Sequence, residues 1–189
     1  VIHSARLVDG GAVHADAWVR FEREHVAAVG TGDSWRSAGH QHSDDTIVDA
    51  SGHWLTPGFV DIHGHGGGGV SYDDGAEQIL TARALHRAHG TTRAVISLVT
   101  APLDALATRV ALIAELCAAH PDILGSHLEG PFLDPGHKGA HDASQLREPD
   151  EAAVALLIEA ASGTLRQVTI APELPGGMAA VAQLRAAGV

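Results

Sequence analysis

The sequence is poor in cysteine and in positive charge. Cys117 is the one cysteine among 189 residues, so no disulfide can form within the chain, and a reducing, cytoplasmic setting is expected. Acidic residues outnumber Lys and Arg by 23 to 12, which gives a net charge of −11. A chain with this charge gains little from contact with nucleic acid or an anionic membrane surface, so we expect neither as a partner. A small metabolite is the expected partner.

Long apolar runs are absent as well. No stretch approaches the roughly 18 apolar residues of a membrane-spanning helix, and the first residues, VIHSARLVDGG, lack the basic-then-apolar order of a signal peptide. Hydrophobic residues make up 45% of the chain, as in ordinary globular proteins. The composition therefore predicts a soluble, globular chain.

Two different sequence patterns follow one another along the chain. Residues 1–54 carry short strand-like pieces, such as AWVRFE and HVAAVG, between Gly, Asp and Ser turns, and they predict a small β domain. Residues 55–189 repeat a strand, loop and helix pattern, with strands expected near 58–63, 93–98, 123–128 and 167–171. Continuous apolar strands between amphipathic helices are typical of an α/β fold with a parallel sheet. Asp150 is expected to cap a helix start, and Gly90 and Gly163 to end helices.

The number of strand-helix units leaves two architectures open. A closed (β/α)8 barrel takes about 250 residues, whereas residues 57–189 contain four units, about half of one. The chain is therefore either a piece of a longer protein or an open α/β domain with four strands.

The first motif with chemical content is PGFVDIHGHGGGG, residues 57–69. Side chains two apart in a strand share a face, so Asp61, His63 and His65 point the same way if the strand persists. Parallel α/β folds place their chemistry at this end of the strands. Two imidazoles there suit a divalent cation such as zinc, iron or cobalt, and the glycines would leave room for a ligand. The alternative is a pair of ordinary loop histidines.

The second motif is SHLEGPF, residues 126–132, at the end of the third predicted strand. His127 and Glu129 share a face, and a carboxylate at this place is costly unless it is paired or bound to a metal. We expect Glu129 to bind the same cation as His63 and His65, the alternative being a solvated carboxylate. His127 is expected behind the ligands rather than among them.

Together these residues resemble the amidohydrolase superfamily and, within it, the N-acetylglucosamine-6-phosphate deacetylase family. The resemblance rests on TPGFVDIHGHGG at 56–67, SHLEGPFLDPGHKGAHD at 126–142 and VTIAPE at 168–173. It covers this chain but only the N-terminal half of such an enzyme. It implies an α/β fold in which residues 55–189 form the first half of a metal-dependent (β/α)8 TIM-like barrel. Residues 1–54 would then form part of a small β-sandwich domain preceding it.

The resemblance also implies a reaction, the metal-dependent hydrolysis of N-acetylglucosamine 6-phosphate to glucosamine 6-phosphate and acetate. His63, His65 and Glu129 would hold one or two divalent ions, with zinc expected and iron or cobalt as alternatives. The Ala140 backbone and the His141 side chain would bind the sugar, unless GHKGAHD is a plain surface loop. The catalytic aspartate and two further metal-binding histidines would lie beyond Val189, so the chain alone would be inactive. The resemblance further implies a homodimer.

Two other functions stay open. Cyclic-amide hydrolases such as dihydroorotases and hydantoinases resemble the chain at GFVDIHGH, but they bridge their metals with a carboxylated lysine at the end of the fourth strand. The fourth strand here, RQVTIAPE, has no lysine, and Lys138, the chain's one lysine, belongs to the loop after the third strand. The second alternative is a metal-binding fragment without catalytic activity.

Overall fold

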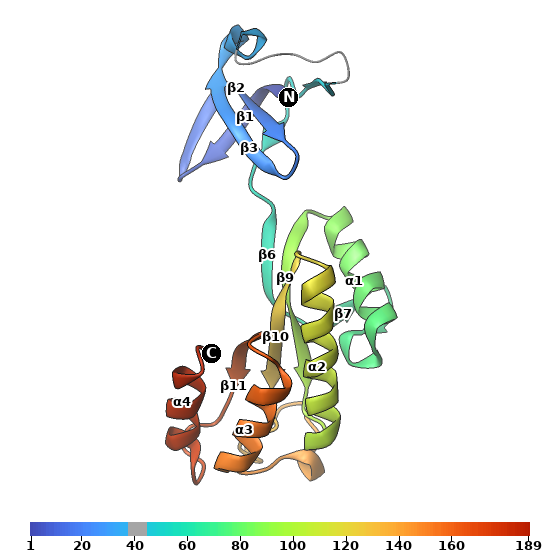
Figure 1. Ribbon diagram of the computed structural model, residues 1–189, viewed down its shortest axis with the longest axis vertical. Coiled ribbons are helices and arrows are strands. Elements are labelled where there is room, and N and C mark those ends of the chain that lie inside the picture. Colours follow the sequence, from blue (N-terminus) through green and yellow to red (C-terminus); the bar gives the residue numbers. More distant parts are fainter. Residues whose placement is uncertain (38–44) are drawn as a thin grey trace. The chain divides into compact units, whose positions relative to one another are not determined.

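The computed structural model describes residues 1–37 and 45–189, which divide into two compact units, Val1–Pro57 and Gly58–Val189 (Figure 1). The division falls within a few residues of the boundary expected at 54. Each unit has its own sheet. No helix in the described ranges is both long and apolar enough to cross a membrane.

The first unit is built on one five-stranded sheet with the order β3-β2-β1-β4, in which β5 also pairs with β1. The first three strands form antiparallel hairpins, and the two short strands run parallel to β1. Leu7, Ala17 and Val19 form its small core. The sandwich predicted for this region stays a prediction. The strands are β1 (Ile2–Asp9), β2 (Ala12–Glu22), β3 (His25–Thr31), β4 (Val48–Asp49) and β5 (Trp54–Leu55), with a 3-10 turn η1 at Gly32–Arg36.

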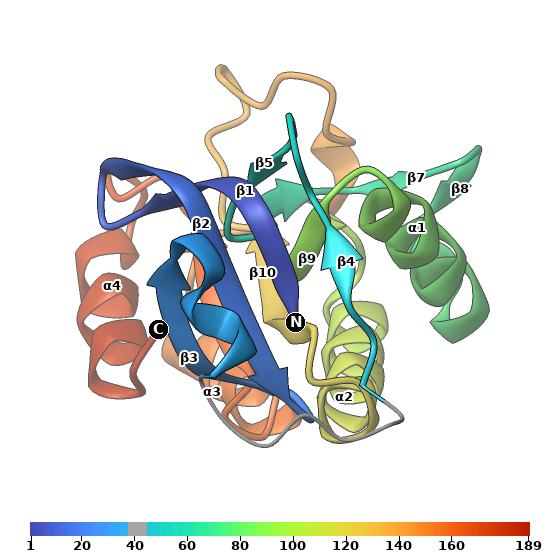
Figure 2. The ribbon, with the colours of Figure 1, turned by 90° about the horizontal axis from the view of Figure 1, so that it is seen from above.

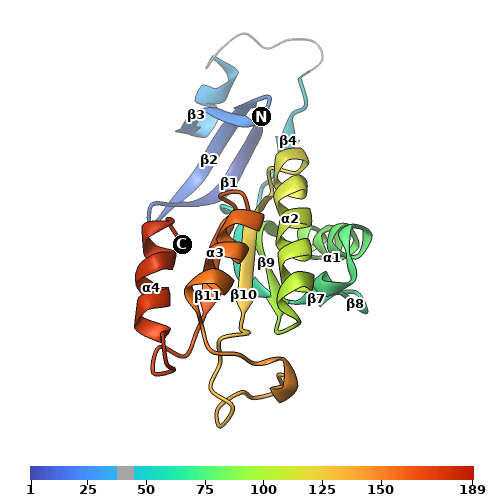
Figure 3. The same ribbon diagram turned by 60° about the horizontal axis from the view of Figure 1, so that its bottom comes forward.

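The second unit contains a four-stranded parallel sheet in the order β6-β9-β10-β11. This confirms the prediction that the four strands are parallel neighbours in sequence order. The helices follow one another along one side of the sheet (Figures 2 and 3). The strands are β6 (Phe59–Gly64), β9 (Thr91–Val99), β10 (Ile123–Glu129) and β11 (Leu165–Thr169), and the helices are α1 (Ala76–Ala88), α2 (Leu103–Ala119), α3 (Glu151–Ala160) and α4 (Gly177–Ala186).

The helix boundaries follow the signals in the sequence. The Asp150 carboxylate accepts a hydrogen bond of 2.8 Å from the Ala153 amide and caps the start of α3. This bond and the neighbouring Arg147 guanidinium lower the pKa of Asp150. Gly90, with a φ of 95°, takes the left-handed conformation that ends α1, and α3 is followed by two residues of positive φ, Ser162 at 48° and Gly163 at 79°.

The core lies between the helices and one face of the sheet. Leu106, Val110 and Ile113 of α2 are fully buried against sheet residues such as Ile96 and Leu128. Cys117 is partly buried at the edge of this core, and burial raises the pKa of its thiol. Fully burying side chains of this size stabilises a fold by about 1.5–3 kcal/mol each. The apolar residues at helical spacing in the α2 sequence thus form the face that packs against the sheet.

A parallel sheet with helices along one side fits a partial TIM barrel. In such a barrel the opposite face of the strands lines the interior, and functional side chains gather at the C-terminal strand ends. Apolar residues of the edge strand β6, namely Phe59, Val60 and Ile62, are 70%, 55% and 57% exposed among the described residues. The C-terminal strand ends of this sheet are therefore where a partial barrel would carry its functional side chains.

The core packing can be tested by removing volume on α2. Ile113→Ala should lower the free energy of unfolding of the full-length protein by about 2–5 kcal/mol, because the fully buried side chain leaves a cavity. Leu156→Ala is the control, because Leu156 of α3 is 41% exposed, and it should change the free energy of unfolding by less than about 1 kcal/mol. Denaturant unfolding measures both. Equal effects of the two variants would contradict the packing described for α2.

Candidate metal centre

Three side chains converge at the C-terminal ends of β6 and β10. His63 is the residue before the last in β6, His65 follows the strand, and Glu129 is the final residue of β10. The Nε2 atoms of His63 and His65 are 3.2 Å apart. Glu129 Oε1 is 3.3 Å from His63 Nε2, and Oε2 is 2.9 Å from His65 Nε2. Each carboxylate oxygen therefore faces one imidazole.

This spacing suits a divalent cation. A tetrahedral zinc ion, with ligand bonds of about 2.0–2.2 Å, separates its ligand atoms by about 3.3 Å. The two imidazole nitrogens are 3.2 Å apart, and each is 2.9–3.3 Å from one oxygen of Glu129. Imidazole nitrogen and carboxylate oxygen are the donors that such an ion takes. Over residues 1–37 and 45–189, the group of three or more potential ligands with atoms within 4.8 Å of one another is His63, His65 and Glu129. The predicted residues are thus brought together in a geometry that could hold a metal.

The three side chains are partly exposed in this chain. The side chains of His63, His65 and Glu129 are 46%, 35% and 23% exposed. The Nδ1 atom of His65, in contrast, is buried and has no hydrogen-bond partner among the described residues. The polar atom of His65 that faces the other two side chains is therefore Nε2.

The segment after His65 folds back on its main chain. The carbonyl oxygen of His65 accepts hydrogen bonds from the Tyr72 amide at 2.9 Å and from the Ser71 hydroxyl at 3.3 Å. The next residue, Asp73, forms a 2.9 Å ion pair with Arg109 of α2. Burial raises the pKa of Asp73, although Arg109 acts in the opposite direction. These contacts fix the backbone that carries His65.

The glycines after His65 serve the tight fold of this segment. Gly66 and Gly67 form β7 (Gly66–Gly67), which pairs antiparallel with β8 (Val70–Ser71). Gly66 has a φ of 138°, and a Cβ atom there would lie 2.1 Å from the Val70 carbonyl oxygen. From the sequence, these glycines were expected to leave room for a ligand. The structure shows that close backbone approach already requires the first of them.

Asp61 does not join the three ligands. The strand ends at Gly64, and its pairing with β9 slips between Asp61 and Gly64, so strict alternation does not run through the motif. Asp61 pairs with Ala94, a residue of the core beneath the helices. Its carboxylate accepts a hydrogen bond of 3.1 Å from the His63 amide. Asp61 thus holds the backbone of the motif through the His63 amide and is not a ligand beside His63 and His65.

His127 lies beside the cluster with both ring nitrogens engaged. Nδ1 is 2.8 Å from Ser97 Oγ, and Nε2 is 2.8 Å from Thr169 Oγ1. The residue is completely buried. Burial, reinforced by His63, lowers the pKa of His127 to about 4, so the ring is neutral at pH 7. No ring nitrogen is left to bind an ion.

The loop after β10 brings His141 to the edge of the cluster. His141 Nε2 is 3.6 Å from Glu129 Oε2, and Nδ1 is 2.8 Å from the hydroxyl of Thr100. Lys138 donates a 2.8 Å hydrogen bond to the His141 carbonyl, so its ammonium group is used within the loop. Ala140 lies beside His141 in an exposed turn. The predicted substrate-binding pair is thus next to the candidate metal ligands.

Sequence reasoning missed Thr100. It directly follows Val99, the residue of β9 that pairs with Glu129, and its hydroxyl also bonds the Glu129 carbonyl at 3.2 Å. Gly130, with a φ of 89°, makes room for it, because a Cβ there would lie 2.2 Å from Thr100 Oγ1. The available signal was a hydroxyl residue at the end of the second predicted strand, level with Glu129.

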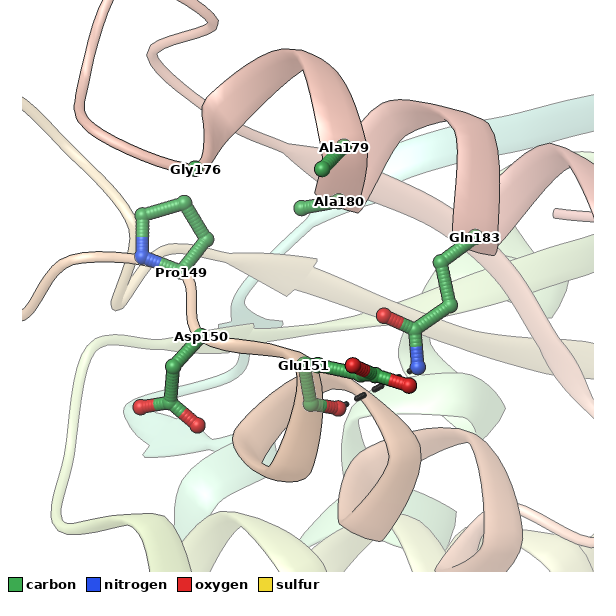
Figure 4. A pocket seen from close by; sticks show the side chains of 7 residues that line it. All are labelled: Pro149, Asp150, Glu151, Gly176, Ala179, Ala180 and Gln183. Atoms are coloured by element: carbon green, nitrogen blue, oxygen red, sulfur yellow. Dashed lines mark hydrogen bonds between the residues drawn. The ribbon is translucent and has the colours of Figure 1, made fainter.

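A separate pocket lies between α3 and α4 (Figure 4). Asp150, Glu151 and Gln183 contribute its polar side chains, and the Gln183 amide donates a 3.2 Å hydrogen bond to the Glu151 carbonyl. None of the residues of the cluster lines it. The pocket is therefore not the candidate metal centre.

The chain is similar to known proteins of one kind. The chain is 35% identical over 144 residues to N-acetylgalactosamine-6-phosphate deacetylase of Escherichia coli O157:H7, which covers 74% of this chain and 38% of the relative. It is 34% identical over 208 residues to human N-acetylglucosamine-6-phosphate deacetylase, covering 98% of this chain and 46% of the relative. No family model matches the chain.

Solved structures agree over the full chain. The crystal structure of N-acetyl-D-glucosamine-6-phosphate deacetylase from Mycobacterium smegmatis matches with a TM-score of 0.86 and 38% identity, covering 100% of this chain and 51% of that one. A mutant of that protein in complex with N-acetyl-D-glucosamine-6-phosphate matches with a TM-score of 0.84 and 38% identity, covering 100% and 47%.

The chain belongs to the N-acetylglucosamine-6-phosphate deacetylase family. It spans about half the length of the relatives it matches. The resemblance drawn from the three sequence motifs is thereby confirmed, and so is the α/β fold class. The cyclic-amide hydrolases are not favoured by these matches.

The candidate metal centre can be tested through its carboxylate. In the full-length protein, Glu129→Gln should weaken zinc binding by more than about 100-fold, because it removes the negative charge that faces both imidazoles. Glu148→Gln, an exposed carboxylate in the same connection, is the matched control. Competition with a chromophoric chelator measures the affinity. Normal zinc binding and turnover in Glu129→Gln would remove Glu129 from the ligands.

Proposed function

We propose that the full-length protein hydrolyses the acetamide of N-acetylglucosamine 6-phosphate and releases glucosamine 6-phosphate and acetate. The observation that carries this proposal is the convergence of His63, His65 and Glu129 at the strand ends of a chain with 38% identity to a solved deacetylase. That protein has also been seen, as a mutant, with N-acetyl-D-glucosamine-6-phosphate bound. The substrate is a small, anionic amino sugar.

His63, His65 and Glu129 would hold a divalent metal ion, for which we propose zinc. A bound divalent ion lowers the pKa of water toward about 7 and polarises an amide carbonyl, which is the chemistry that this hydrolysis needs. Iron and cobalt take the same donors and are the alternatives. The donor set permits either one ion or two.

His141 is the residue of this chain that we assign to the sugar. Its Nε2 atom is at the edge of the cluster, 3.6 Å from Glu129, while Thr100 and Lys138 hold the ring and the main chain. A substrate whose acetamide lies at the ligands would have its ring within reach of this loop. We also propose that the backbone of Ala140 takes part. The catalytic base is expected outside residues 1–189.

The 4-epimer of the sugar is a second candidate substrate. The Escherichia coli O157:H7 relative at 35% identity is named for N-acetylgalactosamine 6-phosphate, which differs from the glucosamine substrate in the configuration of one hydroxyl group. The complex with the gluco sugar, at 38% identity over the whole chain, favours the first substrate. The homodimer and the cytoplasmic setting expected from the sequence stay predictions.

The reaction can be tested by measuring acetate release from purified full-length protein loaded with zinc, iron or cobalt. N-acetylglucosamine 6-phosphate should react much faster than unphosphorylated N-acetylglucosamine, and dihydroorotate and hydantoin should not react. N-acetylgalactosamine 6-phosphate is assayed in parallel to rank the two epimers. Hydrolysis of the cyclic amides without acetate release from either sugar phosphate would make the deacetylase proposal wrong. Metal binding without any hydrolysis would favour the non-catalytic alternative.

A further inference from the structure

A continuous line of hydrogen bonds crosses the ends of all four parallel strands of the second unit. The Gly64 amide of β6 donates to Ser97 Oγ of β9 at 3.2 Å. Ser97 Oγ is 2.8 Å from His127 Nδ1 of β10, and His127 Nε2 is 2.8 Å from Thr169 Oγ1 of β11. Ser97 and His127 are both 0% exposed, so water cannot substitute for these bonds.

The direction of this line follows from its first donor. A backbone amide only donates, so Ser97 Oγ accepts from Gly64. The described residues offer the Ser97 hydroxyl proton one acceptor, His127 Nδ1, because no other bond of this side chain is found among them. A neutral imidazole that accepts at Nδ1 carries its proton on Nε2 and donates it to Thr169. The Ser97 hydroxyl and both ring nitrogens of His127 then each have a hydrogen-bond partner.

The line contacts the ring of His63 and lies within one or two residues of His65 and Glu129 along the chain. Gly64 lies between His63 and His65, and Glu129 follows His127 by two residues. The His63 ring stands edge-on against the His127 ring, with centroids 4.8 Å apart and planes at 86°. A shift of His127 or Ser97 would therefore move both the imidazole and the peptide that set the ligand spacing.

We propose that Ser97 and His127 are positioning residues, which hold His63, His65 and Glu129 at the spacing that binds the metal. Thr169 is the acceptor that fixes His127 in this orientation. The proposal rests on the metal site given under the proposed function, but it concerns metal affinity and not the identity of the substrate.

The test is zinc affinity in the full-length protein, measured without substrate by competition with a chromophoric chelator. Ser97→Ala and Thr169→Val should each weaken binding by about 10- to 100-fold, the range found when groups that orient metal ligands are removed. Thr169→Ser keeps the hydroxyl and should restore the affinity of the unsubstituted protein.

Ser126→Ala is the matched control. Ser126 is the neighbour of His127 on the same strand, is 0% exposed, and has a hydroxyl without a hydrogen-bond partner in the described part of the chain. It should leave zinc affinity unchanged. Circular dichroism and thermal unfolding of all four variants show that any loss of affinity is not a loss of fold.

A second measurement reads the orientation directly. In histidine-labelled protein, nitrogen-15 NMR should show His127 with its proton on Nε2, and Ser97→Ala should abolish this preference. Affinities of Ser97→Ala and Thr169→Val equal to that of Ser126→Ala would overturn the proposal, as would a proton on Nδ1 in the unsubstituted protein. A protein that shows the expected affinities but releases no acetate from sugar phosphates would refute the proposed reaction alone. Absence of zinc binding in the unsubstituted protein would overturn both.

Discussion

The chemistry of the second unit depends on one partly buried carboxylate. Glu129 sits at a strand end with an imidazole opposite each of its oxygens, at 3.3 and 2.9 Å. A carboxylate withdrawn from water is costly unless positive charge meets it, and converging nitrogen and oxygen donors repel one another unless a proton or a metal ion lies between them. The fold brings these groups together and holds them there, an arrangement that a divalent cation between them would stabilise.

Several independent contacts keep the three groups in place. Parallel pairing aligns Glu129 with Val99 and Thr169. The buried residues of α2 pack against the helix-covered face of the sheet. The hairpin after β6 and the Asp73–Arg109 pair secure the main chain of His65. Because these contacts come from different elements, the site is set by the fold of the whole unit and not by either sequence motif alone.

Much of this could be predicted from the sequence. The apolar strands and the stripe of Leu106, Val110 and Ile113 predicted the parallel sheet and its helix layer. Continuous apolar strands are typical of a sheet buried on both faces, and apolar residues at helical spacing form one buried face of a helix. The position of His63 and Glu129 at the ends of two predicted parallel strands predicted a shared strand-end site, because parallel strands finish at the same edge of a sheet.

The details that escaped prediction share a physical cause. The side of the sheet on which Asp61 lies depends on a slip in strand pairing, and such irregularities leave no trace in hydrophobic period. The role of Gly66 depends on the close approach of Val70, and the role of Thr100 on the path of a loop that returns His141 to the sheet. Contacts of this kind exist only after distant segments are brought together.

Anomalous diffraction from crystals of the full-length protein with zinc tests the central claim most directly. We predict a zinc peak about 2.0–2.2 Å from Nε2 of His63, Nε2 of His65 and a carboxylate oxygen of Glu129. A zinc peak bound elsewhere, with these three side chains apart from it, would contradict the account.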